Sequence, residues 1–397
     1  MRPPLPKSTA NSLPLPEGAA LAHTAACAAM LRAEITAADG WISFARFMEL
    51  ALYAPGLGYY AAGARKFGAD GDFVTAPEIS SLFGQSLAVT IADVLRQTGG
   101  SVLELGPGSG KLAKDVLLAL DGMGALPEKY LLLEVSADLR ERQRHALTAL
   151  PAHLASRAVW LDTLPENFVG VIVANEVLDV IPVHVLAWCG GHDVERGVGL
   201  AGNQFVWRDR PIADAALLAA SNKIGAVYLE SDPAEDYVSE YAPAVSGLVT
   251  SLAQSLHRGA MLLIDYGFRG AEFYHPQRTT GTLMCHYRHF AHADPFLYPG
   301  LQDITAHVDF TLVAEAGIAA GLELAGYTTQ ANFLLASGLT ELLGKADPRD
   351  AAAYLPLTNQ LQRLVSPAEM GEFFKVLGFT KGDVSIPALI KARPLPL

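Results

Sequence analysis

Three glycines at alternate positions follow a short apolar run in residues 101–111, S-V-L-E-L-G-P-G-S-G-K. An apolar strand that breaks into glycines and resumes as a helix is typical of a nucleotide-binding turn, because glycine adopts positive φ and lets a ligand approach the backbone. The dinucleotide fingerprint is G-x-G-x-x-G and binds a pyrophosphate, whereas Gly106, Gly108 and Gly110 follow a G-x-G-x-G spacing. Glu104, two residues before the first glycine, would repel a pyrophosphate and attract a cationic amino-acid group. The turn therefore favours S-adenosylmethionine over NAD.

A second acid, Glu134, ends the next predicted strand and is followed by Val135. In a doubly wound sheet, an acid at this place accepts hydrogen bonds from ribose hydroxyls. NAD and S-adenosylmethionine both carry a ribose, so Glu134 indicates a nucleoside without naming it. Asp162 and Thr163 follow the third predicted strand, and their position alone predicts that they lie next to the adenine ring.

Asn175, Glu176 and Asp179 end the fourth predicted strand in the run N-E-V-L-D, where the methyl acceptor is expected. The i, i+3 spacing places Glu176 and Asp179 on one helix face. Methyl transfer from a sulfonium is an in-line displacement, so catalysis consists mainly of positioning the two reacting atoms. If the acceptor is a guanidinium, paired carboxylates would bind it bidentately and orient one nitrogen. The alternative is that these acids cap the helix that follows.

The order of apolar segments predicts the sheet that positions these residues. From residue 101 the chain alternates short apolar runs with helical segments, which is the rhythm of a parallel, doubly wound α/β sheet. Strands are predicted at 102–105, 130–135, 158–161, 169–174 and 260–266. Ligands bind at the carboxyl ends of such strands, so the glycine turn, Glu134 and the N-E-V-L-D run are expected at one edge of the sheet.

Several segments lie outside this alternation. Helices are predicted at 19–38, 41–53 and 237–256, and a short strand at 227–229. Residues 183–235 are interpreted as a β-rich insertion that covers the sheet and shapes substrate access. Residues 54–80 mix glycine, proline and aromatic residues without periodicity. Within them Thr75, Pro77 and Glu78 are predicted to close the site from the N-terminal side.

The composition is that of a folded, acidic protein, with 397 residues, 51% hydrophobic, 18% charged and a net charge of −12. This charge argues against nucleic-acid binding, which depends on Lys and Arg contacts to phosphates. No apolar run reaches the roughly 18 residues of a membrane span, so no membrane insertion is expected.

Cys27, Cys189 and Cys285 lie far apart, and the histidines lack metal-ligand spacing. We therefore expect no disulfide, no metal site and a reducing, cytoplasmic compartment, in keeping with a proline-rich N-terminus that lacks secretory and mitochondrial leader features.

Nine blocks between about residue 40 and residue 380 together carry a family resemblance. They read L-Y-A-P-G-L-G-Y-Y, G-D-F-V-T-A-P-E-I-S, E-L-G-P-G-S-G, E-V-S, N-E-V-L-D-V-I-P-V, L-L-I-D-Y-G, I-T-A-H-V-D-F, T-Q-A-N-F-L and M-G-E-F-F-K-V-L. Over these blocks the chain resembles the MidA family of class I methyltransferases, which includes the mitochondrial respiratory complex I assembly methyltransferase. The resemblance implies S-adenosylmethionine as cofactor and, for the mitochondrial member, symmetric dimethylation of an arginine in a complex I subunit. After N-E the family often carries aromatic residues, where this chain has Val177 and Leu178.

The predicted fold class is α/β, with the Rossmann-like, seven-stranded sheet of class I methyltransferases that the resemblance implies. An N-terminal helical extension and an inserted α/β region that covers the substrate complete it. The domains are expected at 1–18 (a proline-rich arm), 19–97 (the helical extension, which contributes to the site) and 98–397 (the methyltransferase domain, interrupted by 183–235).

The predicted function is methyl transfer from S-adenosylmethionine to an arginine of a protein substrate, with a respiratory-complex subunit as one candidate; no oligomeric state is predicted. The predicted catalytic residues are Asn175, Glu176 and Asp179. The predicted cofactor-binding residues are Thr75, Pro77, Glu78, Glu104, Gly106, Pro107, Gly108, Gly110, Glu134, Val135, Asp162, Thr163 and Asn175. Two alternatives stay open. One is a non-catalytic assembly factor whose insertion binds a client protein, and the other is an NAD oxidoreductase, which the glycine spacing opposes.

Overall fold

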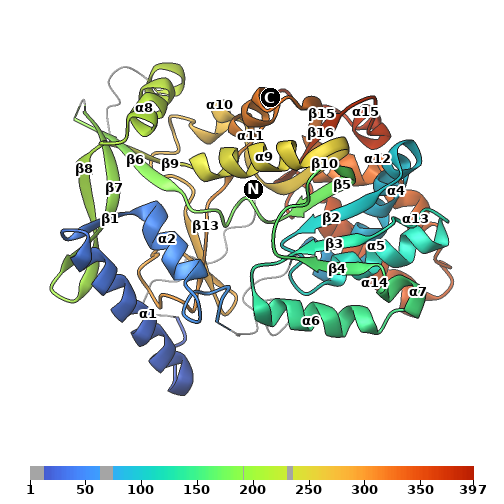
Figure 1. Cartoon of the computed structure of the whole chain (residues 1–397), viewed down its shortest axis with the longest axis horizontal. Helices are drawn as coiled ribbons and strands as arrows, with labels where there is room; N and C mark the ends of the chain where they lie inside the picture. Colours follow the sequence, from blue (N-terminus) through green and yellow to red (C-terminus); the bar gives the residue numbers. More distant parts are fainter. Residues whose placement is uncertain (1–12, 63–74, 191, 230–235) are drawn as a thin grey trace.

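The computed structural model describes residues 13–62, 75–190, 192–229 and 236–397. The described chain forms two lobes that lie side by side (Figure 1). The sheet lobe is built on a large mixed sheet, and the second lobe on a smaller antiparallel sheet. Residues 63–74 of the glycine- and proline-rich segment 54–80, which include Asp70 and Asp72, lie outside the described residues. Parts of the predicted arm and of the predicted insertion lie outside them as well.

The large sheet has the strand order β15-β16-β10-β5-β2-β3-β4. Its strands are β2 (Ser101–Leu105), β3 (Tyr130–Leu133), β4 (Ala158–Leu161), β5 (Phe168–Asn175), β10 (Leu256–Phe268), β15 (Glu323–Thr329) and β16 (Phe374–Lys381). β2, β3, β4, β5 and β10 are parallel, whereas β16 is antiparallel to both of its neighbours. The predicted seven-stranded α/β fold is confirmed, and a short strand, β14 (Val308–Asp309), additionally pairs with the end of β10.

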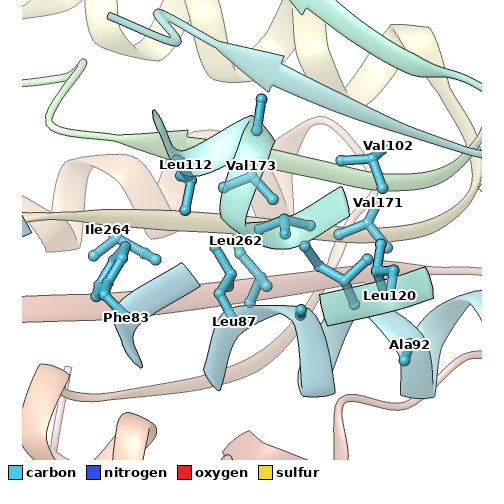
Figure 2. Packing of buried hydrophobic residues seen from close by; sticks show 14 of the residues in the cluster. Phe83, Leu87, Ala92, Val102, Leu112, Leu120, Val171, Val173, Leu262 and Ile264 are labelled. Carbon is cyan, nitrogen blue, oxygen red and sulfur yellow. The ribbon is translucent and has the colours of Figure 1, made fainter. Parts of the chain in front are cut away.

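Alternate residues of the central strands face opposite layers of helices, because successive side chains of a strand point to opposite faces. Figure 2 shows Val102, Val171 and Leu262 packed with side chains of α4 and α5. Leu103 and Leu263 face the other layer. The strands are thus buried on both sides, which explains their continuous apolar runs in the sequence.

Helices cover both faces of the large sheet. The first layer consists of α4 (Ser81–Thr98), α5 (Lys111–Gly122), α6 (Ala137–Thr148), α7 (Ala152–Ala155), α12 (Gln330–Ala336), α13 (Leu339–Leu343), α14 (Ala351–Val365) and α15 (Pro387–Lys391). The second layer consists of α9 (Pro243–Ser255) and α11 (Phe310–Ala319). None of the helices in the described ranges is long and apolar enough to cross a membrane.

The second lobe combines the N-terminal region with strands that follow β5 in the sequence. Its larger sheet contains β1 (Trp41–Ser43), β6 (His184–Cys189), β7 (His192–Ala201), β8 (Gln204–Pro211) and β9 (Tyr237–Tyr241). A small sheet contains β11 (Met284–Tyr287), β12 (Phe290–His292) and β13 (Asp303–Thr305). The helices are α1 (Gly18–Ala37), α2 (Phe44–Tyr53), α8 (Ala215–Tyr228) and α10 (Gly270–Phe273). α1, α2 and both sheets share one apolar cluster, so the N-terminal segment belongs structurally with the insertion.

The prediction of one helix over 41–53 is wrong at its start. Trp41–Ser43 form β1, which pairs antiparallel with β7, and α2 begins at Phe44. The Ser43 side chain accepts a hydrogen bond from the backbone N–H of Arg46. Such an N-cap fixes where a helix begins. The residues before it pair with β7, where Gly199 stands opposite Trp41 at a separation of 199 − 41 = 158 positions, and local periodicity does not reveal so distant a partner.

Two further element predictions are wrong. The predicted helix over 237–256 is β9 followed by α9, because Pro243 begins the helix at a position where its missing N–H costs nothing. The predicted strand over 227–229 is the end of α8, which starts behind the side-chain cap of Asp214. Val227 is exposed there, whereas Tyr228 and Leu229 pack against the apolar cluster that contains Trp188 and Tyr237.

The predicted domain limits stay a prediction, and the packing adds detail to them. α4, which precedes residue 98, packs on the large sheet through Phe83 and Leu87 (Figure 2). β1 joins the sheet formed by the insertion. The segment predicted as an N-terminal extension thus contributes to both lobes.

Candidate functional site

A cavity of about 1300 Å³ lies at the carboxyl ends of β2, β3 and β5 and is closed on the other side by the second lobe. It brings together most of the predicted site residues. Those that line it are Thr75, Pro77, Glu78, Glu104, Gly106, Pro107, Gly108, Glu134, Val135, Asn175, Glu176 and Asp179. Gly110, Asp162 and Thr163 do not belong to its lining.

The glycine turn presents bare backbone to this cavity. Gly106 and Gly108 have φ of 56° and 54°, in the left-handed region that favours glycine. A Cβ on Gly106 would lie 2.9 Å from Cγ2 of Val177. The Gly106 N–H donates to the carbonyl of Leu133 at 3.0 Å, which ties the turn to the end of β3. Gly110 begins α5 as its N-cap, also with positive φ. The turn therefore requires glycine at 106, and its backbone lines the cavity at Gly106 and Gly108.

Glu104 is a buried acid just before this turn. The hydroxyl of Tyr130 donates to its Oε2 at 2.6 Å. Burial raises the pKa of Glu104 to about 7, while the Tyr130 hydrogen bond acts in the opposite direction and the charge of Glu134 adds to the rise. A cationic group in the cavity would stabilise the ionised form of Glu104.

Glu134 is held by a buried glutamine that the sequence did not single out. Gln143 of α6 donates through Nε2 to Oε2 of Glu134 at 3.1 Å and to the carbonyl of Gly108 at 2.9 Å. Its Oε1 accepts from the indole N–H of Trp160 at 2.8 Å, and the backbone N–H of Ser136 donates to Glu134 Oε1 at 2.8 Å. Gln143 thus connects the glycine turn with the acid after β3 and orients both.

Arg140 ties together the loops after β3 and β4. Its Nε donates to the carbonyl of Glu134, and its Nη2 donates to the carbonyl of Leu161, each at 2.6 Å. Its Nη1 pairs with Oδ1 of Asp162 at 2.6 Å. Asp162 is therefore an exposed ion-pair partner beside the cavity, and Val135 is the exposed apolar side chain that lines it here.

The N-E-V-L-D run forms a tight turn after β5 in which Glu176 has φ of 54°. The prediction that Glu176 and Asp179 share a helix face is wrong, because none of the residues described between β5 and β6 forms a helix. A left-handed conformation in a non-glycine residue costs free energy and persists only where its surroundings impose it. Asp265 of β10 imposes it. Its Oδ2 accepts from the N–H groups of Val177, Leu178 and Asp179 at 3.1, 2.9 and 3.3 Å. Asp265 is therefore a positioning residue. It belongs to the L-L-I-D-Y-G block of the family resemblance, but the sequence did not predict that it holds this turn.

Asp179 lies next to Asp265 and is almost fully buried. Burial raises the pKa of Asp179 to about 6, against the opposing effect of a hydrogen bond from Tyr266 and of nearby backbone N–H groups. Burial and the charges of Asp179 and Glu176 raise the pKa of Asp265 well above its ordinary value. The turn therefore concentrates carboxyl groups in a desolvated place, where a cation would be favoured.

The N-terminal wall is a short helix, α3 (Ala76–Ile79), between Thr75 and α4. The N–H of Ala76 donates to Oε1 of Glu176 at 3.4 Å, and the amide of Asn175 donates to the same oxygen at 3.3 Å. The Ser109 hydroxyl donates to Glu78. α3 is thus attached both to the glycine turn and to the turn after β5. Thr75, Pro77 and Glu78 line the cavity, and their role in closing the site stays a prediction.

Within the described residues, no group of three or more His, Cys, Asp or Glu could hold a metal ion. Asp309 of the H-V-D run caps α11, because its Oδ1 accepts from the N–H groups of Thr311 and Leu312 at 3.0 and 3.3 Å. This residue therefore has a structural hydrogen-bonding role.

Comparison with known families agrees with this geometry. A family model described as "Putative S-adenosyl-L-methionine-dependent methyltransferase" matches residues 86–328. The chain belongs to this family. The methyltransferase is also similar to a crystallised protein from Burkholderia thailandensis bound to S-adenosyl-homocysteine, with 49% identity and a TM-score of 0.91, over 96% of this chain and 98% of that one.

Two further relatives of the methyltransferase carry more specific names. A protein named arginine methyltransferase NDUFAF7 homolog, mitochondrial, from Drosophila melanogaster is 29% identical over 386 residues, covering 89% of this chain and 85% of the relative. The arginine methyltransferase NDUFAF7, mitochondrial, from Danio rerio is 30% identical over 380 residues, covering 86% and 84%.

S-adenosylmethionine is the cofactor of this methyltransferase. When bound, it supplies an electrophilic methyl group on a sulfonium sulfur. The residues present fit this group, because Gly106 and Gly108 line the cavity without side chains and buried Glu104 suits its ammonium.

Proposed function

We propose that this methyltransferase transfers the methyl group to a guanidino nitrogen of an arginine in a protein substrate. The observation that carries the proposal is the continuity of the cavity, which runs from Gly106 and Glu134 to the buried carboxyl group of Asp179. A cationic, planar acceptor suits this end, since carboxylates bind guanidinium groups with paired hydrogen bonds. The names of the relatives support the same acceptor.

On this proposal the cofactor half binds by three kinds of contact. Gly106, Pro107 and Gly108 lie against the methionine part, with Glu104 as partner of its ammonium. Glu134 accepts hydrogen bonds from the ribose hydroxyls. Val135 packs on the adenine, while Gly110, Asp162 and Thr163 support this half from outside the cavity lining. Asn175 donates to Glu176 and stands between the two halves.

The reaction is a single displacement. The guanidino nitrogen forms a bond to the methyl carbon as the carbon–sulfur bond breaks, and the electron pair of that bond goes to sulfur. A proton leaves the nitrogen, and Asp179, whose pKa is raised to about 6 by burial, accepts it and passes it to water. Glu176 orients the guanidinium so that one nitrogen is in line with the methyl group.

The experiment is incubation of the full chain with isotopically methyl-labelled S-adenosylmethionine and arginine-containing protein, followed by hydrolysis and mass spectrometry of the amino acids. We expect labelled methylarginine. Label in lysine or another residue would contradict the arginine assignment. Absence of label with intact S-adenosyl-homocysteine binding would favour a client-binding role for the second lobe.

The identity of the substrate protein is a finer question. A respiratory-complex subunit as substrate rests on the family resemblance and stays a prediction. The compartment also stays a prediction, since the sequence indicated a cytoplasmic one and both relatives are named mitochondrial.

A further inference from the structure

Three tyrosines line the half of the cavity that lies away from the glycine turn. Tyr53 is the last residue of α2, Tyr60 follows it in the next loop, and Tyr266 comes from β10. The rings of Tyr53 and Tyr60 stack with their centres 5.6 Å apart and their planes at 18°. Aromatic faces attract cations, and guanidinium groups stack on them. The wall therefore suits a planar cation better than an anion.

The hydroxyl groups of these tyrosines already donate hydrogen bonds within the protein. Tyr53 donates to a backbone carbonyl of the turn after β5 at 2.9 Å, and Tyr60 donates to Oδ1 of Asp303 at 3.1 Å. Tyr266 donates to the carboxyl group of Asp179. A hydroxyl oxygen whose hydrogen is in use offers a ligand only an acceptor. A molecule that meets this wall must therefore bring hydrogen-bond donors.

Asp179 supplies a carboxyl group beside the same wall, and Asp265, which accepts from the backbone N–H of Asp179, is buried next to it. Within the described part of the chain, no residue donates a hydrogen bond to Asp179 Oδ1, although the atom is buried. In the same ranges, no Lys, Arg or His forms an ion pair with Asp179 or Asp265. A buried acid in this situation is costly unless a cation or donor binds it.

The tyrosine wall also adjoins the cofactor half. Burial raises the pKa of Tyr53 well above its ordinary value, and the nearby charges of Asp303, Asp179 and Glu134 add to the rise. The charges of the acid proposed for the ribose and of the acids proposed for the acceptor therefore both act on Tyr53, which lines the same cavity. A group held against Tyr53 would stand where a methyl donor and a methyl acceptor meet.

We propose that Tyr53, Tyr60 and Tyr266, together with Asp179 and Asp303, form the binding site for the guanidinium of the substrate arginine. The tyrosine rings flank the planar group, and Asp179 accepts its N–H donors. This inference rests on the proposed arginine methylation and adds four residues that are new to the site. It also predicts selectivity against lysine, because a compact ammonium cannot cover acceptors on several sides as a planar fork with five donors does.

The test compares conservative variants in steady-state kinetics with an arginine-containing substrate at saturating cofactor. For Tyr266→Phe and Asp303→Asn we expect the KM for the arginine substrate to rise about fivefold to twentyfold. S-adenosyl-homocysteine affinity, measured by calorimetry, should stay within about twofold of wild type. Loss of one neutral or charge-assisted hydrogen bond gives changes of this order.

Two variants serve as matched controls. Tyr327 of β15 is buried against Phe310, outside the cavity lining, so Tyr327→Phe should leave KM and cofactor affinity unchanged. Asp121 is an exposed acid that contacts His153, so Asp121→Asn should be equally silent. Thermal unfolding of each variant separates misfolding from loss of the site.

A second measurement does not depend on turnover. Arginine amide should bind the protein loaded with S-adenosyl-homocysteine, lysine amide should bind at least tenfold more weakly, and Tyr53→Phe and Asp179→Asn should weaken arginine amide binding. If wild type methylates arginine while Tyr266→Phe and Asp303→Asn keep a normal KM, the inference is overturned and the proposed function stands. If arginine amide binds as expected but no arginine is methylated, the binding site stands and the proposed function fails.

Discussion

The proposed cofactor half of the cavity follows the ends of parallel strands, whereas the proposed acceptor half is assembled from segments of both lobes. Gly106 follows β2, Glu134 follows β3 and Asn175 ends β5, so three neighbouring strands deliver three neighbouring groups. In the acceptor half, Tyr53 comes from α2 and Asp303 from the small sheet. These two residues are 250 positions apart and meet through Tyr60.

The difference shows how nucleoside binding, which many proteins perform with similar contacts, and recognition of a particular protein side chain can share a cavity. A nucleoside needs the same few contacts in any protein, and the ends of parallel strands supply them with little help. A protein side chain needs a wall shaped for it, and residues of both lobes line that part of the cavity. Changes in the cofactor half should therefore alter cofactor affinity, and changes in the acceptor half should alter turnover.

The largest expected effect is in the cofactor half. Glu134→Ala should weaken S-adenosyl-homocysteine binding by about 100-fold or more, because two charge-assisted hydrogen bonds to the ribose are lost at about 1.5–3 kcal/mol each. Isothermal calorimetry measures this directly. Glu141→Ala is the matched control, since Glu141 lies on the exposed face of the neighbouring helix α6. Unchanged affinity in Glu134→Ala would remove Glu134 from the cofactor site.

Glu176→Gln tests the acceptor half. The variant should retain cofactor affinity within about twofold and lose methyl transfer by about 10- to 100-fold, since the charge that orients a cationic acceptor is worth about 1.5–3 kcal/mol. Single-turnover transfer with labelled cofactor measures the rate. Full activity would exclude Glu176 from the mechanism, and a parallel loss of cofactor affinity would erase the contrast between the halves.

Gln143→Leu should weaken cofactor affinity by about tenfold. The substitution keeps the volume near that of the native side chain and removes the hydrogen bonds that join the glycine turn to Glu134, each worth about 1 kcal/mol. Because Gln143 acts through other residues, the transfer rate at saturating cofactor should recover to near the native value. Gln362→Ala on the exposed side of α14 is the control. A defect that persists at saturation would indicate general damage to the fold.

The smallest expected effect is a pH dependence of cofactor affinity. Burial raises the pKa of Glu104 to about 7. In the folded, ligand-free protein the Glu104 carboxyl group therefore keeps its proton up to a higher pH than it does in the unfolded chain. The contribution of this protonation to the free energy of unfolding is complete below about pH 4.5 and is lost as the pH rises through about 7. A cationic ligand prefers ionised Glu104, so affinity for S-adenosyl-homocysteine should rise about threefold between pH 6.5 and 7.5. Glu104→Gln should abolish this slope, and a slope that persists in that variant would assign it to another group.

The order of strands and helices and the proposed cofactor-binding residues could be predicted from the sequence alone for a physical reason. Strand–helix alternation has a short period, and each functional group there stands next to its own strand in the chain. Glu104, the glycine turn, Glu134 and Asn175 could therefore be placed at one edge before any contact was known. The same local reasoning failed at 41–53 and 237–256, where a strand partner from far along the chain and a proline changed the element type.

Only the tertiary structure decided the acceptor half and the supports of the cofactor half. Tyr53, Tyr60 and Asp303 are ordinary residues in segments without motif spacing, and Gln143 reads as one polar residue on a charged helix. Tyr60 and Asp303 come together within the second lobe, and Gln143 is buried within the sheet lobe between Glu134 and Trp160. Desolvation and convergence depend on three-dimensional proximity, and sequence periodicity reports only on neighbours along one strand or helix.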